Sequence, residues 1–392
     1  MSPESEISLR YGLNPHQKPA KAFRRYGPLP FTVLNGAPGY INLLDALNSW
    51  QLVKELDAST GLASAASFKH VSPAGAAVAL PISDVLKRIY NIEHSVLSDV
   101  ALAYARARGA DRLSSFGDWV AISRNVDVTL AQLLAREVSD GIIAPSFSPE
   151  ALEVLKKKQD GRYIILQVDL TYIPGDTETR DVFGVTLEQV RNLKIVGKDQ
   201  LANIVTKSKN LPPSAQRDLI VALTTLKYTQ SNSMCLALDG QVIGVGAGQQ
   251  SRIHCTRLAA SKADTWYLRQ HPKVLELQFR KGLSRPEKDN AIDGFIRDDL
   301  SPAELKIWEE SFNIVPARLT AQEKRQWLDG LKGVSMASDA FIPFRDNIDR
   351  AAMSGVRYVV HPGGSVRDAE IVAACDQYGM TLAVSGVRLF HH

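Results

Sequence analysis

A run of small apolar residues that ends in two adjacent basic side chains constrains this chain more than any other feature. Residues 62–68 read Leu-Ala-Ser-Ala-Ala-Ser-Phe, which is typical of a buried strand. Lys69 and His70 follow, and because adjacent side chains on a regular element point apart, both reach one small-molecule site only from a bend. Ser72 and Pro73 then predict a helix N-terminus, with serine as the cap and proline in the first turn. We therefore expect Lys69 and His70 at the carboxyl end of a strand, where open α/β sheets carry their chemistry.

The Lys69–His70 pair has the chemistry that a group-transfer site needs. A neutral imidazole accepts a proton near neutral pH, and an ammonium beside it can face a developing oxyanion. The alternative is structural: the histidine caps a turn beside a surface lysine. For an isolated Lys-His dipeptide that alternative is the better one. Here the small residues 74–77 leave room for a ligand, and so we favour the functional interpretation.

Composition excludes several classes of protein. The chain has 392 residues, which predicts two or three domains, and its 45% hydrophobic and 22% charged residues are ordinary for a soluble globular protein. No apolar run approaches the roughly 18 residues that span a membrane, and the first residues lack the pattern of a secretory signal. The three cysteines, Cys235, Cys255 and Cys375, lie far apart, which disfavours a disulfide framework and favours a cytoplasmic location.

The net charge and the spacing of possible metal ligands limit the classes of partner that this chain can bind. The net charge of +4 is mild and no run of five basic residues occurs, so a small anionic substrate fits better than nucleic acid. The eight histidines and three cysteines show none of the spacings of a zinc site, and we expect no metal centre of that kind. Gly244-x-Gly246 lacks the third glycine of a dinucleotide loop. We interpret this run as backbone that a ligand or partner approaches closely.

Strands and helices alternate up to about residue 178, which predicts an α/β layer arrangement, and a second unit follows a polar connection at 170–182. No internal repeat is evident in the sequence. Residues 265–332 are polar and helical, with capping boxes at Ser301 and Thr320, and they indicate an inserted helical segment. The other expected elements are helices at 41–56, 148–161, 214–227 and 367–378, strands at 119–122, 139–145, 163–166, 356–360 and 381–384, and a hairpin of 234–238 with 242–245.

Eight motifs in order carry a resemblance to a known family. They occupy residues 9–17, 68–75, 114–118, 138–145, 228–233, 248–255, 339–347 and 388–392. From Leu9 to His392 the chain resembles the transformylases of 5-aminoimidazole-4-carboxamide ribonucleotide (AICAR), the formyltransferase part of a bifunctional AICAR transformylase/IMP cyclohydrolase. The N-terminal cyclohydrolase domain of that family has no counterpart in this sequence, so we expect one reaction without ring closure. The loop at 362–366 also departs slightly from the family pattern.

The resemblance implies a fold and a domain organisation. We expect α/β architecture made of two cytidine-deaminase-like units with a helical insertion and no catalytic zinc. The units are expected to interleave, with residues 1–178 and 269–330 in the first and residues 179–268 and 331–392 in the second. The resemblance also implies a homodimer with sites built across the interface and a structural monovalent cation.

The implied reaction transfers the formyl group of 10-formyltetrahydrofolate to the 5-amino group of AICAR in purine (IMP) biosynthesis. His70 is expected to be the general base, Lys69 to stabilise the oxyanion or protonate the leaving folate nitrogen, and Asn232 to orient the formyl oxygen or the carboxamide. Besides His70 and Asn232, the residues expected around AICAR are Arg10, Tyr11, Gly117, Asp140, Phe341, Asp346, Ser365, Val366 and Arg388, and those expected toward folate are Arg252 and Ile253. The alternatives are a non-catalytic nucleotide-binding protein and, on charge alone, a nucleic-acid binder.

Overall fold

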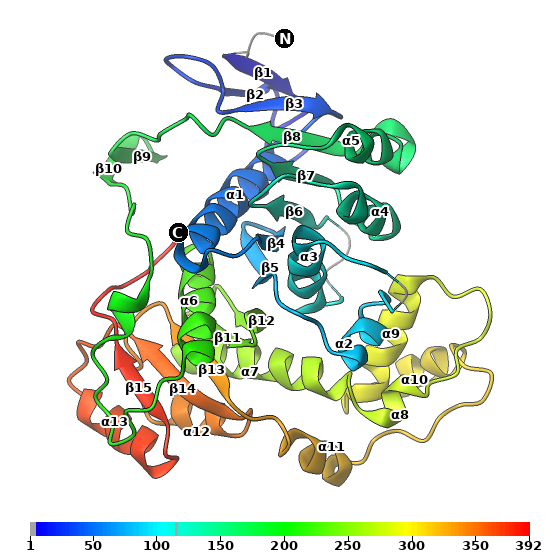
Figure 1. Ribbon diagram of the computed structural model, residues 1–392, viewed down its shortest axis with the longest axis vertical. Coiled ribbons are helices and arrows are strands. Elements are labelled where there is room, and N and C mark those ends of the chain that lie inside the picture. The colour runs from blue at the N-terminus through cyan, green and yellow to red at the C-terminus, as the bar shows by residue number, and fades with distance from the viewer. Residues whose placement is uncertain (1–4, 94, 114–116) are drawn as a thin grey trace.

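The computed structural model describes residues 5–93, 95–113 and 117–392. Its centre is an eleven-stranded mixed sheet that runs from β3 at the top of the view to β15 at the lower left (Figure 1). In spatial order the strands are β15 (Thr381–Val384), β14 (Val356–His361), β13 (Val334–Ser338), β11 (Met234–Leu238), β12 (Gln241–Gly246), β5 (Ser72–Val78), β4 (Ser64–Lys69), β6 (Trp119–Ile122), β7 (Gly141–Ala144), β8 (Ile164–Val168) and β3 (Phe31–Asn35). The expectation of an α/β fold is confirmed, whereas the cytidine-deaminase-like units and their boundaries stay predictions.

Helices cover both faces of the sheet and enclose two hydrophobic cores. One core lies under α1 (Tyr40–Thr60) and α6 (Pro213–Lys227). The other lies under the helices on the opposite face, which are α3 (Asp99–Gly109), α4 (Val128–Arg136), α5 (Pro149–Lys156), α7 (Arg252–Leu268), α12 (Asp346–Ala352) and α13 (Asp368–Gln377). The apolar periodicity at 41–56 and 214–227 thus predicted α1 and α6 correctly, while the helix expected to reach residue 161 ends at Lys156 and a 3₁₀ turn follows it.

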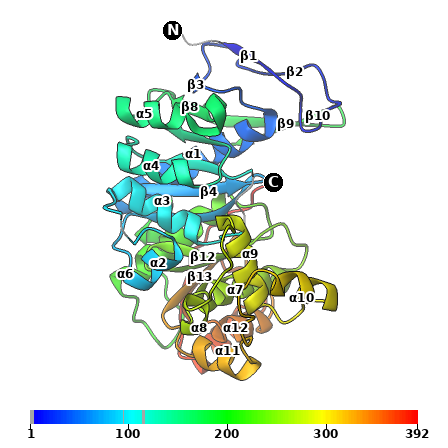
Figure 2. The same ribbon diagram turned by 90° about the vertical axis from the view of Figure 1, so that its right-hand side faces the viewer.

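The expected helical insertion is present and has its own core. It consists of α8 (Pro272–Leu275), α9 (Arg285–Ile296), α10 (Pro302–Glu309) and α11 (Ala321–Leu328), and α2 (Asp84–Ile89) lies nearby. Both predicted capping boxes form, at Ser301 and Thr320. A separate apolar cluster that includes Phe295 and Trp308 holds the insertion together. Figure 2 shows these helices gathered beside α7 and far from the β1–β2 hairpin.

Two short hairpins stand outside the large sheet. β1 (Glu6–Leu9) pairs with β2 (Ala20–Phe23), and β9 (Thr177–Val182) pairs with β10 (Val185–Val190). The β9–β10 hairpin begins inside the stretch that the sequence indicated as a polar connection. Nearly all of its residues are exposed, and Phe183 at its tip is fully exposed.

The prediction of a helix that begins at Ser72 is wrong, because the chain instead turns back as strand β5. Lys69 pairs with Ser72, and His70 and Val71 form a two-residue turn between them. The register shifts beside Pro73, where proline is tolerated because a regular ladder N–H is not required. The small residues serve packing rather than a ligand: a Cβ on Gly75 would lie 2.2 Å from the Ala107 carbonyl oxygen of α3.

The interpretation of Gly244-x-Gly246 is wrong in the same way. A Cβ on Gly244 would lie 2.1 Å from the Ala259 oxygen, and one on Gly246 would lie 2.1 Å from the Cys255 oxygen. Both oxygens belong to α7, so the close neighbour is the chain's own helix rather than a ligand or a partner. These glycines let α7 pack directly on β12.

The two halves of the sheet repeat one structural unit. In the first half α1 is followed by the β4–β5 hairpin, on which α3 packs, and in the second half α6 is followed by the β11–β12 hairpin, on which α7 packs. Each hairpin has a two-residue turn and a register shift just before it. The halves join where β5 and β12 run antiparallel, with Ala77 opposite Gln241.

Candidate functional site

Strand directions bring most of the predicted site residues to the same end of the large sheet. The carboxyl ends of β4, β12, β13, β14 and β15 and the amino ends of β5, β6, β7 and β11 all lie there. We call the residues at this end the site rim: residues 69–71, 117–118, 140, 230–233, 247–253, 339–346, 362–367 and 385–392. Of the predicted residues, only Arg10 and Tyr11, which follow β1, come from outside it.

The site rim is too long for all of these residues to contact one small ligand within a single chain. Asp140 precedes β7, whereas Arg388 lies in the C-terminal tail, where the Leu389 N–H donates to the Asp339 carbonyl just after β13 at 2.8 Å. β13 and β7 are six positions apart in the sheet, which at about 4.8 Å per strand is roughly 29 Å. The residues therefore fall into two groups, one on β4, β6 and β7 and another between β11 and β15.

The first group joins Lys69, Gly117 and Asp140. Gly117 has a positive φ of 78°, and a Cβ there would lie 3.7 Å from Lys69 Cε, so the lysine stem passes directly over this backbone. Burial raises the pKa of Asp140, while the Gly117 N–H and the Lys69 ammonium oppose that rise. Residues 114–116 of the neighbouring motif lie outside the described residues.

His70 projects from the two-residue turn, next to a carboxylate that the sequence analysis missed. His70 and Val71 both have left-handed backbone, with φ of 53° and 58°, and the His70 side chain is exposed. Asp45 of α1 is buried, and its Oδ1 accepts the Val71 N–H at 2.7 Å. Burial raises the pKa of Asp45 to about 6, against the hydrogen bonds from the backbone of Val71 and His70. Its spacing from Leu52 and Leu56, on the buried face of α1, is the signal that could have identified it.

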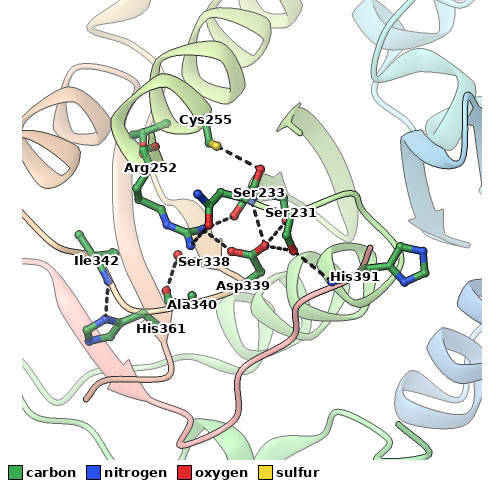
Figure 3. A network of polar contacts seen from close by, with 12 residues as sticks. Ser231, Ser233, Arg252, Cys255, Ser338, Asp339, Ala340, Ile342, His361 and His391 are labelled. Carbon is green, nitrogen blue, oxygen red and sulfur yellow. Dashed lines mark hydrogen bonds and ion pairs between the residues drawn. The ribbon is translucent and has the colours of Figure 1, made fainter. Parts of the chain in front are cut away.

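The second group is built around Asp339, another residue that the sequence analysis did not single out (Figure 3). Its side chain is fully buried. Oδ2 accepts hydrogen bonds from the Ser231 hydroxyl at 2.7 Å and from the Ser233 hydroxyl and backbone N–H, both at 2.9 Å. Oδ1 forms an ion pair with Arg252. Asp339 is the first residue of the motif at 339–347, and its place in that motif could have identified it from the sequence.

Arg252 connects this carboxylate to Asn232. Its guanidinium donates to the Ser233 carbonyl at 2.9 Å and to Asn232 Oδ1 at 2.8 Å, and only 6% of the residue is exposed. The Asn232 amide nitrogen donates to the Gln250 carbonyl at 3.1 Å. The Cys255 thiol donates to the Asn232 carbonyl at 3.1 Å. Both ends of the Asn232 amide are thus oriented by the protein.

The remaining residues of the second group are more exposed. Phe341 is 45% exposed and Val366 fully exposed, and the Arg388 guanidinium lies 4.8 Å from the Phe390 ring centroid. Ser365 lies in the β14–α13 loop, where its backbone N–H and that of Gly364 donate to Asp368. The last predicted residues, Asp346 and Ile253, lie in the first turns of α12 and α7.

Comparison with known proteins assigns the chain to a family. The family model described as AICARFT/IMPCHase bienzyme matches residues 1–262. The chain belongs to this AICARFT/IMPCHase family. The bifunctional purine biosynthesis protein PurH of Xylella fastidiosa (strain 9a5c) is 30% identical over 393 residues, and PurH of two Neisseria gonorrhoeae strains is 30% identical over 392 residues. These alignments cover 98% of this chain and 58% of each relative, so the chain spans little more than half their length.

The AICARFT/IMPCHase chain shows three further properties within its described residues. No group of three or more histidine, cysteine or acidic side chains there is arranged to hold a metal ion. Among the helices of the same residues, none combines the length and the apolar character that crossing a membrane requires. Cys235, Cys255 and Cys375 are all buried free thiols.

Proposed function

We propose that this chain transfers the formyl group of 10-formyltetrahydrofolate to the 5-amino group of AICAR, giving formyl-AICAR and tetrahydrofolate in purine biosynthesis. The observation that carries the proposal is that Lys69, His70 and an oriented Asn232 share the site rim in a chain of the AICARFT/IMPCHase family. The relatives are named as bifunctional purine biosynthesis proteins, which supports the same pathway.

The reaction needs a base, because the lone pair of the AICAR amine is delocalised into the ring. As the new N–C bond forms, His70 takes the amine proton. Lys69 stabilises the tetrahedral oxyanion and then gives a proton to the folate nitrogen as the old C–N bond breaks. Asn232 orients the formyl oxygen or the carboxamide. The Arg252 guanidinium is buried, so Arg252 acts toward folate indirectly, by orienting Asn232, rather than by contacting folate itself.

The ribonucleotide phosphate would be bound by exposed cations. Arg388 and Arg10 are exposed, and a guanidinium can bind phosphate through two parallel hydrogen bonds. The other proposed contacts with AICAR are Tyr11, Gly117, Asp140, Phe341, Asp346, Ser365 and Val366, and Ile253 would contact folate. A structural monovalent cation belongs to the proposal as well. Its all-oxygen donors would be Ser231, Ser233 and Asp339, which suits a hard cation.

The proposal includes a homodimer with shared sites. Within one chain the loop that carries Asn232 lies beside the β4–β5 turn, where the Gln230 N–H donates to the Ser72 hydroxyl at 3.2 Å, so the shared site is proposed from the family resemblance rather than from a separation of the two groups. The β9–β10 hairpin supports association, because a lone two-stranded hairpin is marginal in water and Val185, Leu187 and Phe183 are exposed. A His70→Ala chain mixed with an Arg388→Ala chain, at an AICAR concentration too low to occupy the Arg388→Ala site, should regain activity if these residues come from different subunits.

The test of the function is a direct assay of the purified chain. AICAR and 10-formyltetrahydrofolate are supplied together, and formyl-AICAR is identified by mass while tetrahydrofolate is followed by absorbance. The control is His70→Ala, which should bind AICAR in calorimetry without turnover. A wild-type chain that binds AICAR but releases no formyl-AICAR would favour the non-catalytic alternative, and a chain that binds neither substrate would overturn the proposal.

A further inference from the structure

The repeated unit gives this chain two hairpin turns of the same construction, and only one of them carries reactive side chains. His70 and Val71 form the turn between β4 and β5, with φ of 53° and 58°. Asp239 and Gly240 form the turn between β11 and β12, with φ of 51° and 73°. The second turn lies at the opposite end of the sheet from the site rim, because β5 and β12 run antiparallel.

A buried aspartate holds each turn from an equivalent place. Asp45 is the sixth residue of α1 and Asp218 the sixth residue of α6, and each is 2% exposed. Asp45 accepts the Val71 N–H at 2.7 Å, and Asp218 accepts the Asp239 N–H at 2.8 Å and the Gly240 N–H at 2.5 Å. Burial raises the pKa of both carboxyl groups to about 6.

The two turns differ in how well their own residues suit the backbone. Asp-Gly is a preferred sequence for a two-residue turn with two positive φ values, because glycine adopts them without steric cost. His-Val is a poor one, since a β-branched side chain at positive φ is a steric outlier. The His70–Val71 turn therefore depends on contacts from outside itself, and the buried contact that its backbone makes is with Asp45.

We propose that Asp45 is a positioning residue: by accepting the turn's backbone N–H, it holds Lys69 and His70 in the left-handed turn that presents them to substrate. The effect of this positioning on catalysis rests on the proposed function. Backbone strain held at a reactive pair is a known form of preorganisation, in which surrounding contacts keep side chains in a geometry that the local sequence disfavours. The Asp239–Gly240 turn shows the same scaffold without this strain and without a site.

The first experiment compares Asp45→Ala with Asp218→Ala, a matched loss of a turn-holding aspartate away from the site rim. We expect Asp45→Ala to lower kcat at least tenfold while KM for AICAR changes less than threefold. Asp218→Ala should lower the melting temperature by a similar amount and leave kcat within twofold. Equal effects of the two substitutions on kcat would reduce Asp45 to a structural residue and overturn the proposal.

The second experiment is a rescue. Val71→Gly removes the β-branched side chain and makes the turn compatible with its own backbone. In the Asp45→Ala background it should recover kcat at least threefold, because the turn then needs less support. If Asp45 acted on substrate directly, or only on global stability, Val71→Gly would recover nothing, and that outcome also contradicts the proposal.

A readout without activity separates this proposal from the function. Amide hydrogen exchange at Val71 should quicken at least tenfold in Asp45→Ala and stay unchanged in Asp218→Ala. If the wild-type chain shows no formyl transfer, the proposed function fails, and the exchange rates alone decide whether Asp45 holds the turn. Unchanged exchange at Val71 in Asp45→Ala overturns the positioning role whatever the activity.

Discussion

Replacing Arg252 by methionine should destabilise the chain strongly, because it leaves the carboxylate of Asp339 buried without its counter-charge. Asp339 is fully buried and Arg252 is 6% exposed, so water does not screen the pair. Removing one partner of such a pair typically costs about 3–5 kcal/mol. Three donors from Ser231 and Ser233 stay on Asp339, and we therefore expect the lower end, about 3 kcal/mol.

The assay is urea unfolding of a double-mutant cycle with Asp339→Asn. The double variant Arg252→Met with Asp339→Asn removes both charges. Its loss of unfolding free energy should therefore be at least about 1 kcal/mol smaller than the sum of the losses in the two single variants. Arg252→Lys serves as a control that keeps the charge and loses the contact with Asn232. It should lower kcat, while its free energy of unfolding should fall less than that of Arg252→Met. A loss below about 1 kcal/mol in Arg252→Met, or strict additivity in the cycle, would refute the reasoning.

Four further predictions follow from single sites. His70→Ala should lower kcat by roughly 10²–10⁴ with AICAR binding retained, and near-full turnover would make the histidine structural. Arg388→Ala should weaken AICAR binding by one to two decades, about 1.5–3 kcal/mol, but not binding of the phosphate-free riboside; equal losses would show that it does not bind phosphate. Burial raises the pKa of Asp118 from 3.8 to about 7, so the folded chain holds an extra proton and loses stability as pH rises through this range. Relative to Asp118→Asn, the wild type's free energy of unfolding in urea should therefore fall by about 3 kcal/mol between pH 5 and pH 8. The same pH dependence of this free energy in both chains would contradict the prediction. Gly75→Ala should cost about 1–3 kcal/mol because its Cβ meets the α3 backbone, whereas Gly175→Ala, with open space around it, should change stability by less than about 0.5 kcal/mol.

Local sequence determined the elements whose signals lie within a few residues of one another. The Asp239-Gly240 pair fixes a two-residue turn by its own conformational preference, and the β11–β12 hairpin has the predicted form. The capping boxes at Ser301 and Thr320 likewise satisfy backbone groups three residues away. The apolar stripe of α1 specified a helix face before any partner was known.

Local signals failed where a distant segment set the conformation. Ser72-Pro73 has the composition of a helix start, yet the chain forms a strand there because β4, α3 and the Asp45 carboxylate surround it. The glycines at 244 and 246 had no local explanation until α7 was seen to pack on them. In each case a competing contact comes from another secondary-structure element, whose position in space the local sequence pattern does not reveal.

The sequence by itself determined which chemical groups the chain offers: the Lys69–His70 pair, Asn232, Arg388 and the family to which these motifs belong. Only the tertiary structure decided which of them meet. Strand order places the pair and Asn232 on one rim but in separate groups, and it brings Asp45 and Asp339 behind them as buried carboxylates. The reason is that strand order and burial depend on contacts between segments far apart in the chain, and a side chain's neighbours do not follow from its own position in the sequence.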